Sequence, residues 1–279
     1  MSKKICASCH DSSKKLDSIH RESTLTHQVP EWKRLRGERT LAPFDKLPFL
    51  ENVWERYPVG YDTVVKVNLG KRYVNRVVYY FAAEKRDQIG IKKAPKAYNK
   101  YENSGIVFTD ETGLASLKLK CPQPYKENGI TYYPHVHFFV SNKNNKCWDH
   151  TVRTVNVICN FQKQKLKKII KEKNFILLNA LPNKYYLQDH IPNSFNLPVA
   201  KAKKMNEKDI IKFLKEIVPF YPPILAAYKK IKKVKDLPIL VYCYSKNCGA
   251  GKKLIQRLFE LGFRNIVEYE DGMEGYREK

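Results

Sequence analysis

A cysteine that follows an apolar run is the side chain of this sequence best suited to nucleophilic chemistry. Cys243 comes directly after Ile239 to Tyr242, and the polar residues Tyr244 to Gly249 lead into a helical pattern that extends to Leu261. Ligands of parallel sheets bind beyond the carboxyl ends of strands, where loop N–H groups and a helix N-terminus attract anions. Because the helix dipole favours thiolate over thiol, we expect Cys243 to ionise readily and to carry a persulfide. The alternative is a small apolar residue that merely ends a strand.

A second cysteine, Cys248, lies five residues later on the same polar stretch. Two thiols this close permit disulfide exchange, so Cys248 would serve as a resolving thiol in a redox switch. The alternative is a residue at the start of the helix without a chemical role. Near the N-terminus, Cys6 and Cys9 form either half of a zinc site or a tail with two free thiols. His20 or His27 would have to complete that zinc site.

Two histidines stand two residues apart in the run from Tyr132 to Val140, whose residue types favour a strand. Side chains at i and i+2 of a strand point to the same face, so His135 and His137 form a pair. Together with Tyr125, these imidazoles could bind iron or another transition metal. The alternative is a pair of ordinary histidines whose hydrogen bonds are met within a sheet.

Two different sequence patterns predict the strands and helices that must position these residues. Residues 46–161 contain short runs rich in Val, Tyr, Phe and Thr between polar turns, which predicts an antiparallel β-sandwich. Residues 162–279 alternate apolar runs with helical patterns, which predicts an α/β domain with a parallel sheet. Residues 1–45 are polar and basic and predict a mostly irregular arm. The expected strands are 63–69, 74–81, 105–108, 115–119, 135–140, 151–158, 175–178, 239–242 and 266–269, and the expected helices are 162–173, 205–218, 224–234 and 249–261.

Composition limits the class of protein and the kind of partner. Lys and Arg number 52 against 28 Asp and Glu in 279 residues, a formal net charge of +24 that favours a polyanion or nucleic-acid partner. The alternative is a solvated basic surface. No run is apolar enough for a signal sequence or a membrane span. Seven scattered cysteines do not suggest a disulfide framework, so we expect reduced thiols in a cytoplasmic or other reducing, non-secreted compartment.

The C-terminal part of the sequence resembles the rhodanese family over residues 162–279. The resemblance implies that Cys243 accepts sulfane sulfur from a small donor such as thiosulfate and passes it to a thiol acceptor, without a cofactor. It also implies that the loop N–H groups cradle the persulfide. The matching segments are Ile176 to Leu181, His190 to Pro198, the Cys243 loop, Leu261 to Val267 and Glu270 to Tyr276, and the cradle residues are Tyr244, Ser245, Lys246, Asn247, Cys248 and Gly249.

Three departures from the rhodanese pattern bear on the expected activity. Asn179 and Leu181 stand where the family usually has Asp and Arg, and Cys248 stands where it often has Arg. Lys246 could replace the lost guanidinium only as a point charge, without bidentate hydrogen bonds to an anion. We therefore expect slow or absent turnover of thiosulfate.

Residues 60–160 resemble the core of the intradiol ring-cleavage dioxygenases in four segments: Phe108 to Gly113, Cys121 to Tyr125, Pro134 to Phe139 and Thr151 to Val157. The resemblance implies a β-sandwich that holds Fe(III) with two tyrosines and two histidines. Tyr125, His135 and His137 match three of these four ligand positions. Candidates for the fourth all miss the expected spacing, which implies weak binding; they are Tyr79, Tyr80, Tyr98 and Tyr101. The arginine usual before the histidine pair is replaced by Tyr132 or Tyr133.

Three functions follow from the sequence. The leading one is rhodanese-like sulfur transfer or thiol redox chemistry through a persulfide on Cys243. The second is a non-haem iron dioxygenase that acts through Tyr125, His135 and His137. The third is a non-enzymatic structural or packaging protein, in the virion of a large DNA virus given the lysine bias, with both domains serving as scaffolds.

Overall fold

The computed structural model describes residues 26–28, 53–146, 148–149, 151–161 and 163–278. The chain divides into two units. The first unit contains the described residues up to Arg86 and residues 91–157, and the second contains Asp87–Gly90 and residues from Ile158 onward. Cys6, Cys9 and His20, which the sequence suggested for a zinc site, lie outside the described residues.

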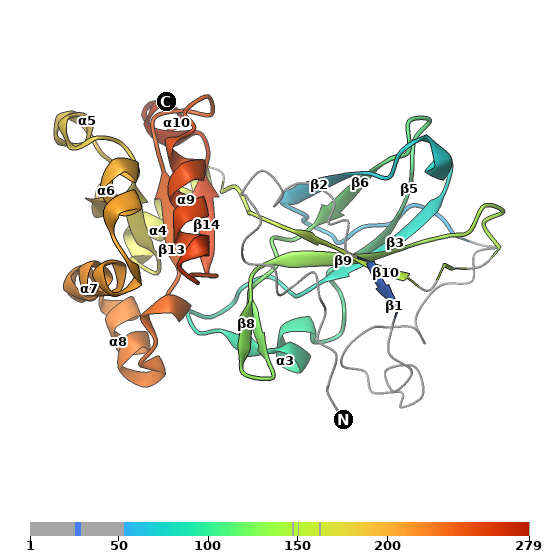
Figure 1. Ribbon diagram of the computed structural model, residues 1–279, viewed down its shortest axis with the longest axis horizontal. Helices are drawn as coiled ribbons and strands as arrows, with labels where there is room; N and C mark the ends of the chain where they lie inside the picture. The colour runs from blue at the N-terminus through green and yellow to red at the C-terminus, as the bar shows by residue number, and fades with distance from the viewer. Residues whose placement is uncertain (1–25, 29–52, 147, 150, 162, 279) are drawn as a thin grey trace. The chain divides into compact units, whose positions relative to one another are not determined.

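A five-stranded antiparallel sheet forms the largest element of the first unit (Figure 1). The strand β1, Thr26–Gln28, pairs with β10; the sequence did not predict this strand, and a mostly irregular arm over residues 1–45 stays a prediction. The histidine strand β9 lies in the middle of the sheet, between β10 and β3. In order across the sheet, the strands are β1, β10 (Thr151–Asn156), β9 (His135–Val140), β3 (Val77–Ala82) and β5 (Ser104–Phe108).

The described residues of the first unit also form two smaller sheets. An antiparallel pair consists of β2 (Thr63–Asn68) and β6 (Leu114–Leu119). A three-stranded sheet contains β4 (Lys92–Lys93), β7 (Tyr125–Glu127) and β8 (Ile130–Tyr132), and the short helix α3, Ala94–Tyr98, follows β4. The predicted antiparallel strands are confirmed, while their arrangement as a sandwich stays a prediction. The sequence pattern missed β4, β7, β8 and α3, which are too short to show periodicity.

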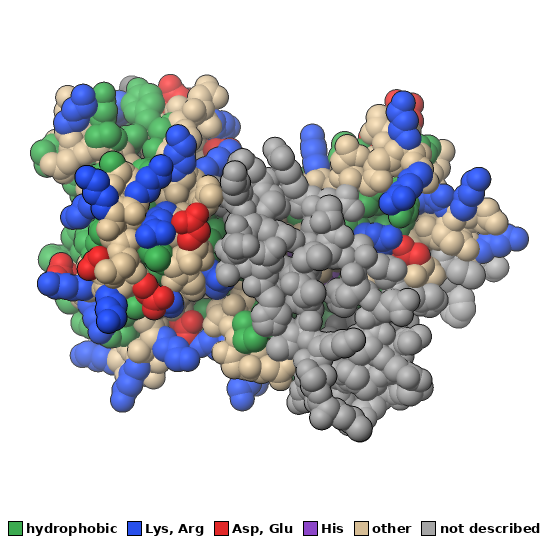
Figure 2. Space-filling model, viewed as in Figure 1, with side chains coloured by type: hydrophobic (Ala, Val, Ile, Leu, Met, Phe, Trp, Pro, Cys, Tyr) green, Lys and Arg blue, Asp and Glu red, His purple; other side chains and the backbone are tan. Residues whose placement is uncertain are grey.

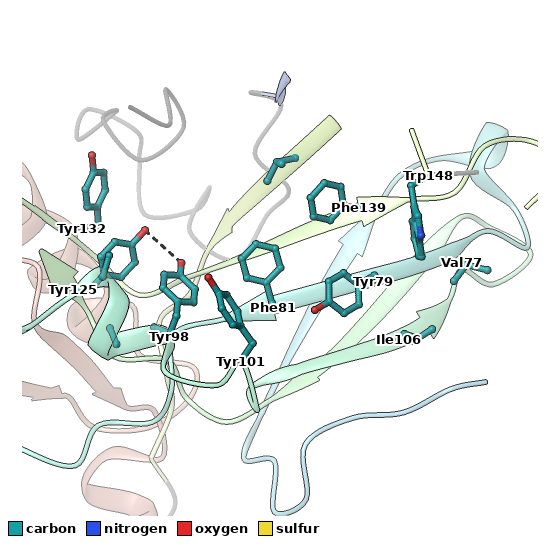
Figure 3. Packing of buried hydrophobic residues seen from close by; sticks show 14 residues of the cluster. Val77, Tyr79, Phe81, Tyr98, Tyr101, Ile106, Tyr125, Tyr132, Phe139 and Trp148 are labelled. Carbon is teal, nitrogen blue, oxygen red and sulfur yellow. Dashed lines mark hydrogen bonds between the residues drawn. The ribbon is translucent and has the colours of Figure 1, made fainter. Parts of the chain in front are cut away.

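Aromatic side chains dominate the core of the first unit. Alternate residues of β3 point into this core, and Tyr79, Phe81 and Phe139 stack on one another with ring centroids 6.2 to 6.5 Å apart (Figure 3). Stacked aromatic pairs add to the stability gained from burial of their area. At one end of this row, Tyr98 and Tyr125 point toward each other.

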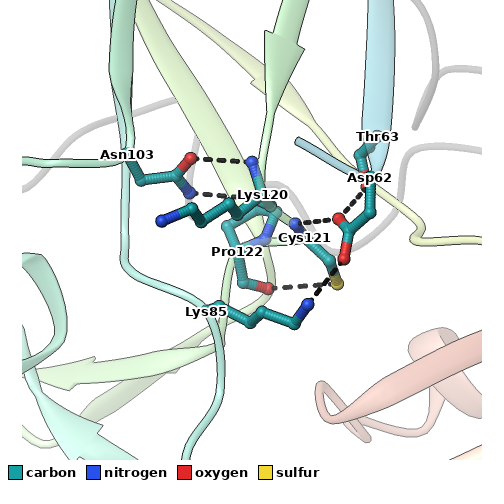
Figure 4. A network of polar contacts seen from close by, with 7 residues as sticks. All are labelled: Asp62, Thr63, Lys85, Asn103, Lys120, Cys121 and Pro122. Carbon is teal, nitrogen blue, oxygen red and sulfur yellow. Dashed lines mark hydrogen bonds and ion pairs between the residues drawn. The ribbon is translucent and has the colours of Figure 1, made fainter. Parts of the chain in front are cut away.

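A polar network joins the strand ends beside this core (Figure 4). The carboxylate of Asp62 accepts a hydrogen bond from the Cys121 backbone N–H at 2.6 Å and pairs with Lys85 Nζ at 2.9 Å. The side chain of Asn103 both accepts from the Lys120 N–H and donates to the Lys120 carbonyl, each at 2.8 Å. Because buried amide groups need partners, these bonds fix the end of β6 against the neighbouring segments.

The second unit contains a four-stranded sheet in which every neighbouring pair is parallel, as predicted. Its order is β12 (Ser194–Asn196), β11 (Ile176–Asn179), β13 (Ile239–Tyr242) and β14 (Ile266–Tyr269). The residues of β11, β13 and β14 are all buried, which is typical of parallel strands covered on both faces. The carboxyl ends of these strands therefore lie at one edge of the sheet, and Cys243 follows the strand between β11 and β14.

Helices join these strands, and their boundaries follow local signals. Asn206 and Asp209 form a reciprocal capping box at the start of α7, while Gly262, at φ +87°, follows the end of α9. The helix α9 packs against β13 and β14. The predicted helices correspond to α4 (Lys163–Glu172), α7 (Glu207–Ile217), α8 (Pro222–Ile231) and α9 (Ala250–Glu260), and the sequence missed α5 (Asn183–Gln188), α6 (Val199–Lys204) and α10 (Gly272–Arg277).

The surface charge is spread rather than gathered on the face that Figure 2 shows. There, Lys and Arg side chains of the described residues alternate with Asp and Glu and with polar atoms. None of the helices in the described part of the chain has the length and apolar character needed to cross a membrane.

Candidate active site

The loop after β13 forms the candidate active site of the second unit. Strand β13 pairs with β11 on one side and β14 on the other, so Cys243 leaves the sheet between two neighbouring strand ends. The loop runs from Tyr244 to Gly249, and α9 begins at Ala250. Tyr244, Lys246, Asn247 and Gly249 are exposed, while Ser245 and Cys248 are partly buried. The structure therefore places Cys243 where a parallel sheet binds its ligands.

The Cys243 thiol is buried, with 2% of the residue exposed. Its Sγ lies 3.0 Å from the carbonyl oxygen of Cys248 and 3.7 Å from that of Ser245. Burial, followed by a hydrogen bond to the Cys248 side chain, raises the pKa of Cys243 to about 12, although N–H groups of Gly251 and Ser245 act in the opposite direction. The prediction that this thiol ionises readily is wrong, because desolvation outweighs the loop amides.

Cys248 has the electrostatic environment that the sequence assigned to Cys243. Partial burial acts to raise the pKa of Cys248, but N–H groups of Tyr244 and Ala250, followed by the Cys243 thiol, outweigh it and leave the pKa below its ordinary value. Both cysteines are free thiols. The Cys248 sulfur is therefore the first of the two to become a thiolate. By contrast, Cys121 and Cys159 are disulfide-bonded, so the prediction of reduced thiols is wrong for these two residues.

The helix α10 and the turn before it hold the start of this loop in place. The N–H of Met273 donates to the Cys243 carbonyl at 3.0 Å, and the N–H of Glu274 donates to the Tyr244 carbonyl at 2.9 Å. Gly272 makes this approach possible, since a Cβ at its φ of +61° would lie 2.5 Å from the Cys243 carbonyl oxygen. The segment Glu270 to Tyr276 thus fixes the backbone that leads out of Cys243.

The lysine of the loop forms an ion pair outside the loop. Lys246 Nζ forms an ion pair with Asp271 Oδ1 at 3.0 Å, and its side chain is 67% exposed. Lys252, on α9, pairs with Glu270 Oε1 at 3.1 Å. Both cations thus face carboxylates of the turn before α10.

A buried carboxyl group lies close to the cysteine loop. Glu268, on β14, is 5% exposed, and burial raises its pKa to about 7, with Lys252 lowering it and Glu270 raising it. A Cβ on Gly251 would lie 3.1 Å from Glu268 Oε1 and 3.5 Å from Cys243 Sγ. Gly251 therefore leaves room for both groups at the first turn of α9.

The histidine pair of the first unit lies in a second cluster of polar groups. His135 Nε2 lies 3.0 Å from His137 Nε2 and 3.1 Å from the Tyr125 hydroxyl. Tyr98 joins them: its hydroxyl lies 3.5 Å from His135 Nε2 and 3.4 Å from the Tyr125 hydroxyl. All four side chains are buried. The structure brings together the three residues that the sequence proposed, and it adds a fourth that sequence spacing had excluded.

The other ring nitrogens of the two histidines face oxygen atoms of the surrounding protein. His135 Nδ1 lies 2.7 Å from the Tyr133 carbonyl oxygen, and His137 Nδ1 lies 2.8 Å from Thr154 Oγ1. Such contacts orient the rings and direct both Nε2 atoms to one point. Among the described residues, no group of three or more His, Cys, Asp or Glu side chains could hold a metal ion. Any metal in this cluster would therefore need the tyrosine oxygens.

Sequence reasoning missed three residues of these sites. Tyr98 misses the sequence spacing expected of the fourth ligand, although its hydroxyl lies 3.5 Å from His135 Nε2 in the folded chain. Glu268 carried a visible signal, since an acidic residue inside the apolar run Ile266 to Tyr269 is unusual. Gly272 lies within the segment that resembles rhodanese, but only the structure shows which carbonyls it approaches.

Comparisons with known proteins agree with the fold of the second unit. The sequence model of the rhodanese-like domain family matches residues 162–279. The thiosulfate sulfurtransferase GlpE of Coxiella burnetii is 22% identical over 110 residues, which cover 39% of this chain and 78% of that protein.

Two solved structures of sulfur-transferring proteins are also similar. The human single-domain sulfurtransferase TSTD1 is 15% identical, with 43% of this chain and 97% of that chain covered and a TM-score of 0.30. SseA from Escherichia coli, a 3-mercaptopyruvate sulfotransferase, is 17% identical, with 42% and 45% covered and a TM-score of 0.28. The family match covers the parallel sheet and the Cys243 loop. Residues 162–279 therefore form a rhodanese-like domain.

Proposed function

We propose that this protein transfers sulfane sulfur through a persulfide on Cys243. The observation that carries the proposal is the position of the Cys243 sulfur at the end of β13, with N–H groups of Gly251 and Ser245 directed to it. Backbone N–H groups in this arrangement stabilise the negative charge of a persulfide. The sulfurtransferase named among the similar proteins supports thiosulfate as the donor to test first.

The proposed first step requires a base, because Cys243 holds its proton. The Cys248 side chain interacts with the Cys243 thiol and is the more readily ionised of the two, so its thiolate form is placed to accept the proton. As the proton moves to Cys248, the Cys243 sulfur attacks the outer sulfur of thiosulfate. The sulfur–sulfur bond of thiosulfate breaks, sulfite leaves with the electron pair, and Cys243 carries the persulfide. In simple sulfur transfer, an external thiol then takes the outer sulfur.

The test is to incubate the full chain with thiosulfate and to follow sulfite release and the mass of the Cys243 peptide. We expect that peptide to gain the mass of one sulfur atom and to lose it to cyanide as thiocyanate. Cys243→Ser should abolish the transfer, while Cys147→Ser, outside residues 162–279, should retain it. Sulfite release without sulfur on Cys243, or no labelling by thiosulfate or mercaptopyruvate, would contradict the proposal.

A second candidate function is an iron site in the first unit, favoured by the convergence of Tyr98, Tyr125, His135 and His137. Two imidazoles and two phenols form a donor set that suits ferric iron. His135 and His137 would bind through Nε2, because both Nδ1 atoms face oxygen partners. Bound iron of this kind would supply oxidative chemistry with dioxygen. We also propose that the antiparallel sheets around this cluster form the β-sandwich that the dioxygenase resemblance implies.

Iron content and colour test this candidate. Phenolate ligands give ferric iron a visible absorption band, so the full chain loaded with one equivalent of Fe(III) should become coloured. Tyr98→Phe should weaken that band and the affinity for iron. The matched control is Tyr79→Phe, which removes a hydroxyl from the same aromatic core but outside the four residues. A full chain that binds no stoichiometric iron, or binds it without the band, would exclude the site.

A further inference from the structure

The two thiols of the loop are poised to react with one another as well as with a donor. The Cys243 Sγ donates to the carbonyl oxygen of Cys248 at 3.0 Å, and the Cys248 side chain is close enough to shift the pKa of Cys243. The Cys248 N–H donates to the Ser245 carbonyl at 2.9 Å, which closes a tight turn within the loop. Cys248 is also the more exposed of the pair, whereas Cys243 is 2% exposed.

A persulfide on Cys243 offers two sulfur atoms to an attacking thiol. Attack on the outer sulfur expels the Cys243 thiolate, and attack on the inner sulfur expels hydrosulfide. Exchange is faster when the leaving sulfur belongs to the stronger acid. Burial raises the pKa of Cys243 to about 12, so its thiolate is a poor leaving group and hydrosulfide is the better one. Only a thiol that is already inside the loop can easily reach the buried inner sulfur.

We propose that Cys248 resolves the Cys243 persulfide by attacking its inner sulfur, which forms a Cys243–Cys248 disulfide and releases hydrosulfide. This inference rests on the proposed formation of that persulfide. The new bond joins the two Sγ atoms, and the bond between Cys243 Sγ and the sulfane sulfur breaks. The sulfane sulfur leaves with the electron pair and takes the proton from the Cys248 thiol. It is reduced to sulfide while the two cysteines are oxidised, so no outside oxidant is needed.

The disulfide product sets the class of co-substrate that the protein needs for turnover. A dithiol reductant must convert the Cys243–Cys248 disulfide back into two thiols, and it becomes a disulfide itself. Monothiols form mixed disulfides that require a second thiol to complete the exchange, so a dithiol restores the loop more directly. The protein would then release sulfide from a sulfane donor while it oxidises a dithiol to a disulfide.

A single turnover of the full chain in the absence of oxygen and added thiol tests the inference. The probe is thiosulfate, and the readouts are free sulfide, sulfite and peptide mapping of Cys243 and Cys248. Wild type should release about one sulfide per sulfite and should yield a peptide pair joined by the disulfide. Cys248→Ser should load more slowly, because its proton acceptor is lost, but it should keep the sulfur on Cys243 and release at least tenfold less sulfide per loaded chain. Cys147→Ser is the control and should match wild type.

The outcomes separate this inference from the proposed function. If wild type keeps a stable Cys243 persulfide and releases no sulfide, the resolving role of Cys248 is overturned and sulfur transfer through Cys243 stands. Equal sulfide release from wild type and Cys248→Ser also overturns it. If neither protein places sulfur on Cys243, both sulfur transfer through Cys243 and the resolving role of Cys248 are wrong. The wild-type experiment alone decides the matter, even if the variant does not fold.

Discussion

Replacement of Glu268 by Gln should stabilise the second unit at neutral and alkaline pH. Burial raises the pKa of this carboxyl group from 4.5 to about 7 in the folded chain. Below about pH 4.5, the group is protonated in both the folded and the unfolded chain and has no effect on their balance. Between about pH 4.5 and 7, it ionises only in the unfolded chain, so the free energy of unfolding falls as the pH rises. Above about pH 7, it is ionised in both states and the full cost remains.

The size of this cost follows from the difference between the two pKa values. At about 1.36 kcal/mol per pKa unit, a change from 4.5 to about 7 corresponds to about 3 kcal/mol. Gln has nearly the same shape and carries no charge, so Glu268→Gln should recover most of that free energy at pH 8. At pH 4.5, the two proteins should differ by less than about 1 kcal/mol, because a protonated carboxyl group and an amide are both neutral.

The assay must report on the second unit, because all three tryptophans of the chain precede Ile158. Pulsed hydrogen exchange across a urea series, read in peptides that contain β13 and β14, gives the unfolding midpoint of this sheet. Glu216→Gln, which removes an exposed carboxylate from α7, is the control and should shift the stability by less than about 0.5 kcal/mol at either pH. A Glu268→Gln protein that is no more stable than wild type at pH 8, or whose gain is the same at pH 4.5, would refute the reasoning.

Two further substitutions test how the cysteine loop is held. Gly272→Ala should lower the free energy of unfolding by about 2 to 4 kcal/mol and slow sulfur loading, since a Cβ would meet the Cys243 carbonyl oxygen at 2.5 Å and the backbone would have to move. Gly262→Ala is its control in urea unfolding, because that Cβ would meet only side-chain atoms of Lys235 and no backbone, and equal losses would argue against the steric account. Lys246→Ala should change the rate of sulfite release from thiosulfate by less than about threefold and should leave the urea unfolding midpoint close to that of wild type, as expected for an exposed ion pair with Asp271. A loss of about a hundredfold would instead show that Lys246 leaves Asp271 to bind the anion.

Local patterns in the sequence were sufficient for the strands and helices that are long or strongly apolar. Runs such as Ile239 to Tyr242 are buried on both faces and can form only the interior of a sheet. Alternation with helices then makes that sheet parallel, and a cysteine at the end of such a strand must lie at the ligand-binding edge. Sequence alone therefore predicts that Cys243 lies at this edge. Short elements such as β7 and α3 were not predicted, because they hold too few residues for a period to appear.

The chemical state of each site depended on contacts that no local pattern contains. A strand-to-helix loop suggested a thiolate at Cys243, but the depth of burial decides the outcome, and it favours the thiol there and the thiolate at Cys248. The same holds for Tyr98, which reaches His135 only because α3 and β9 come together in the folded first unit. Sequence determines which groups are available and on which strand ends they lie. Desolvation and long-range proximity are properties of the packed chain, so only the tertiary structure decided which sulfur ionises first and which tyrosine joins the histidines.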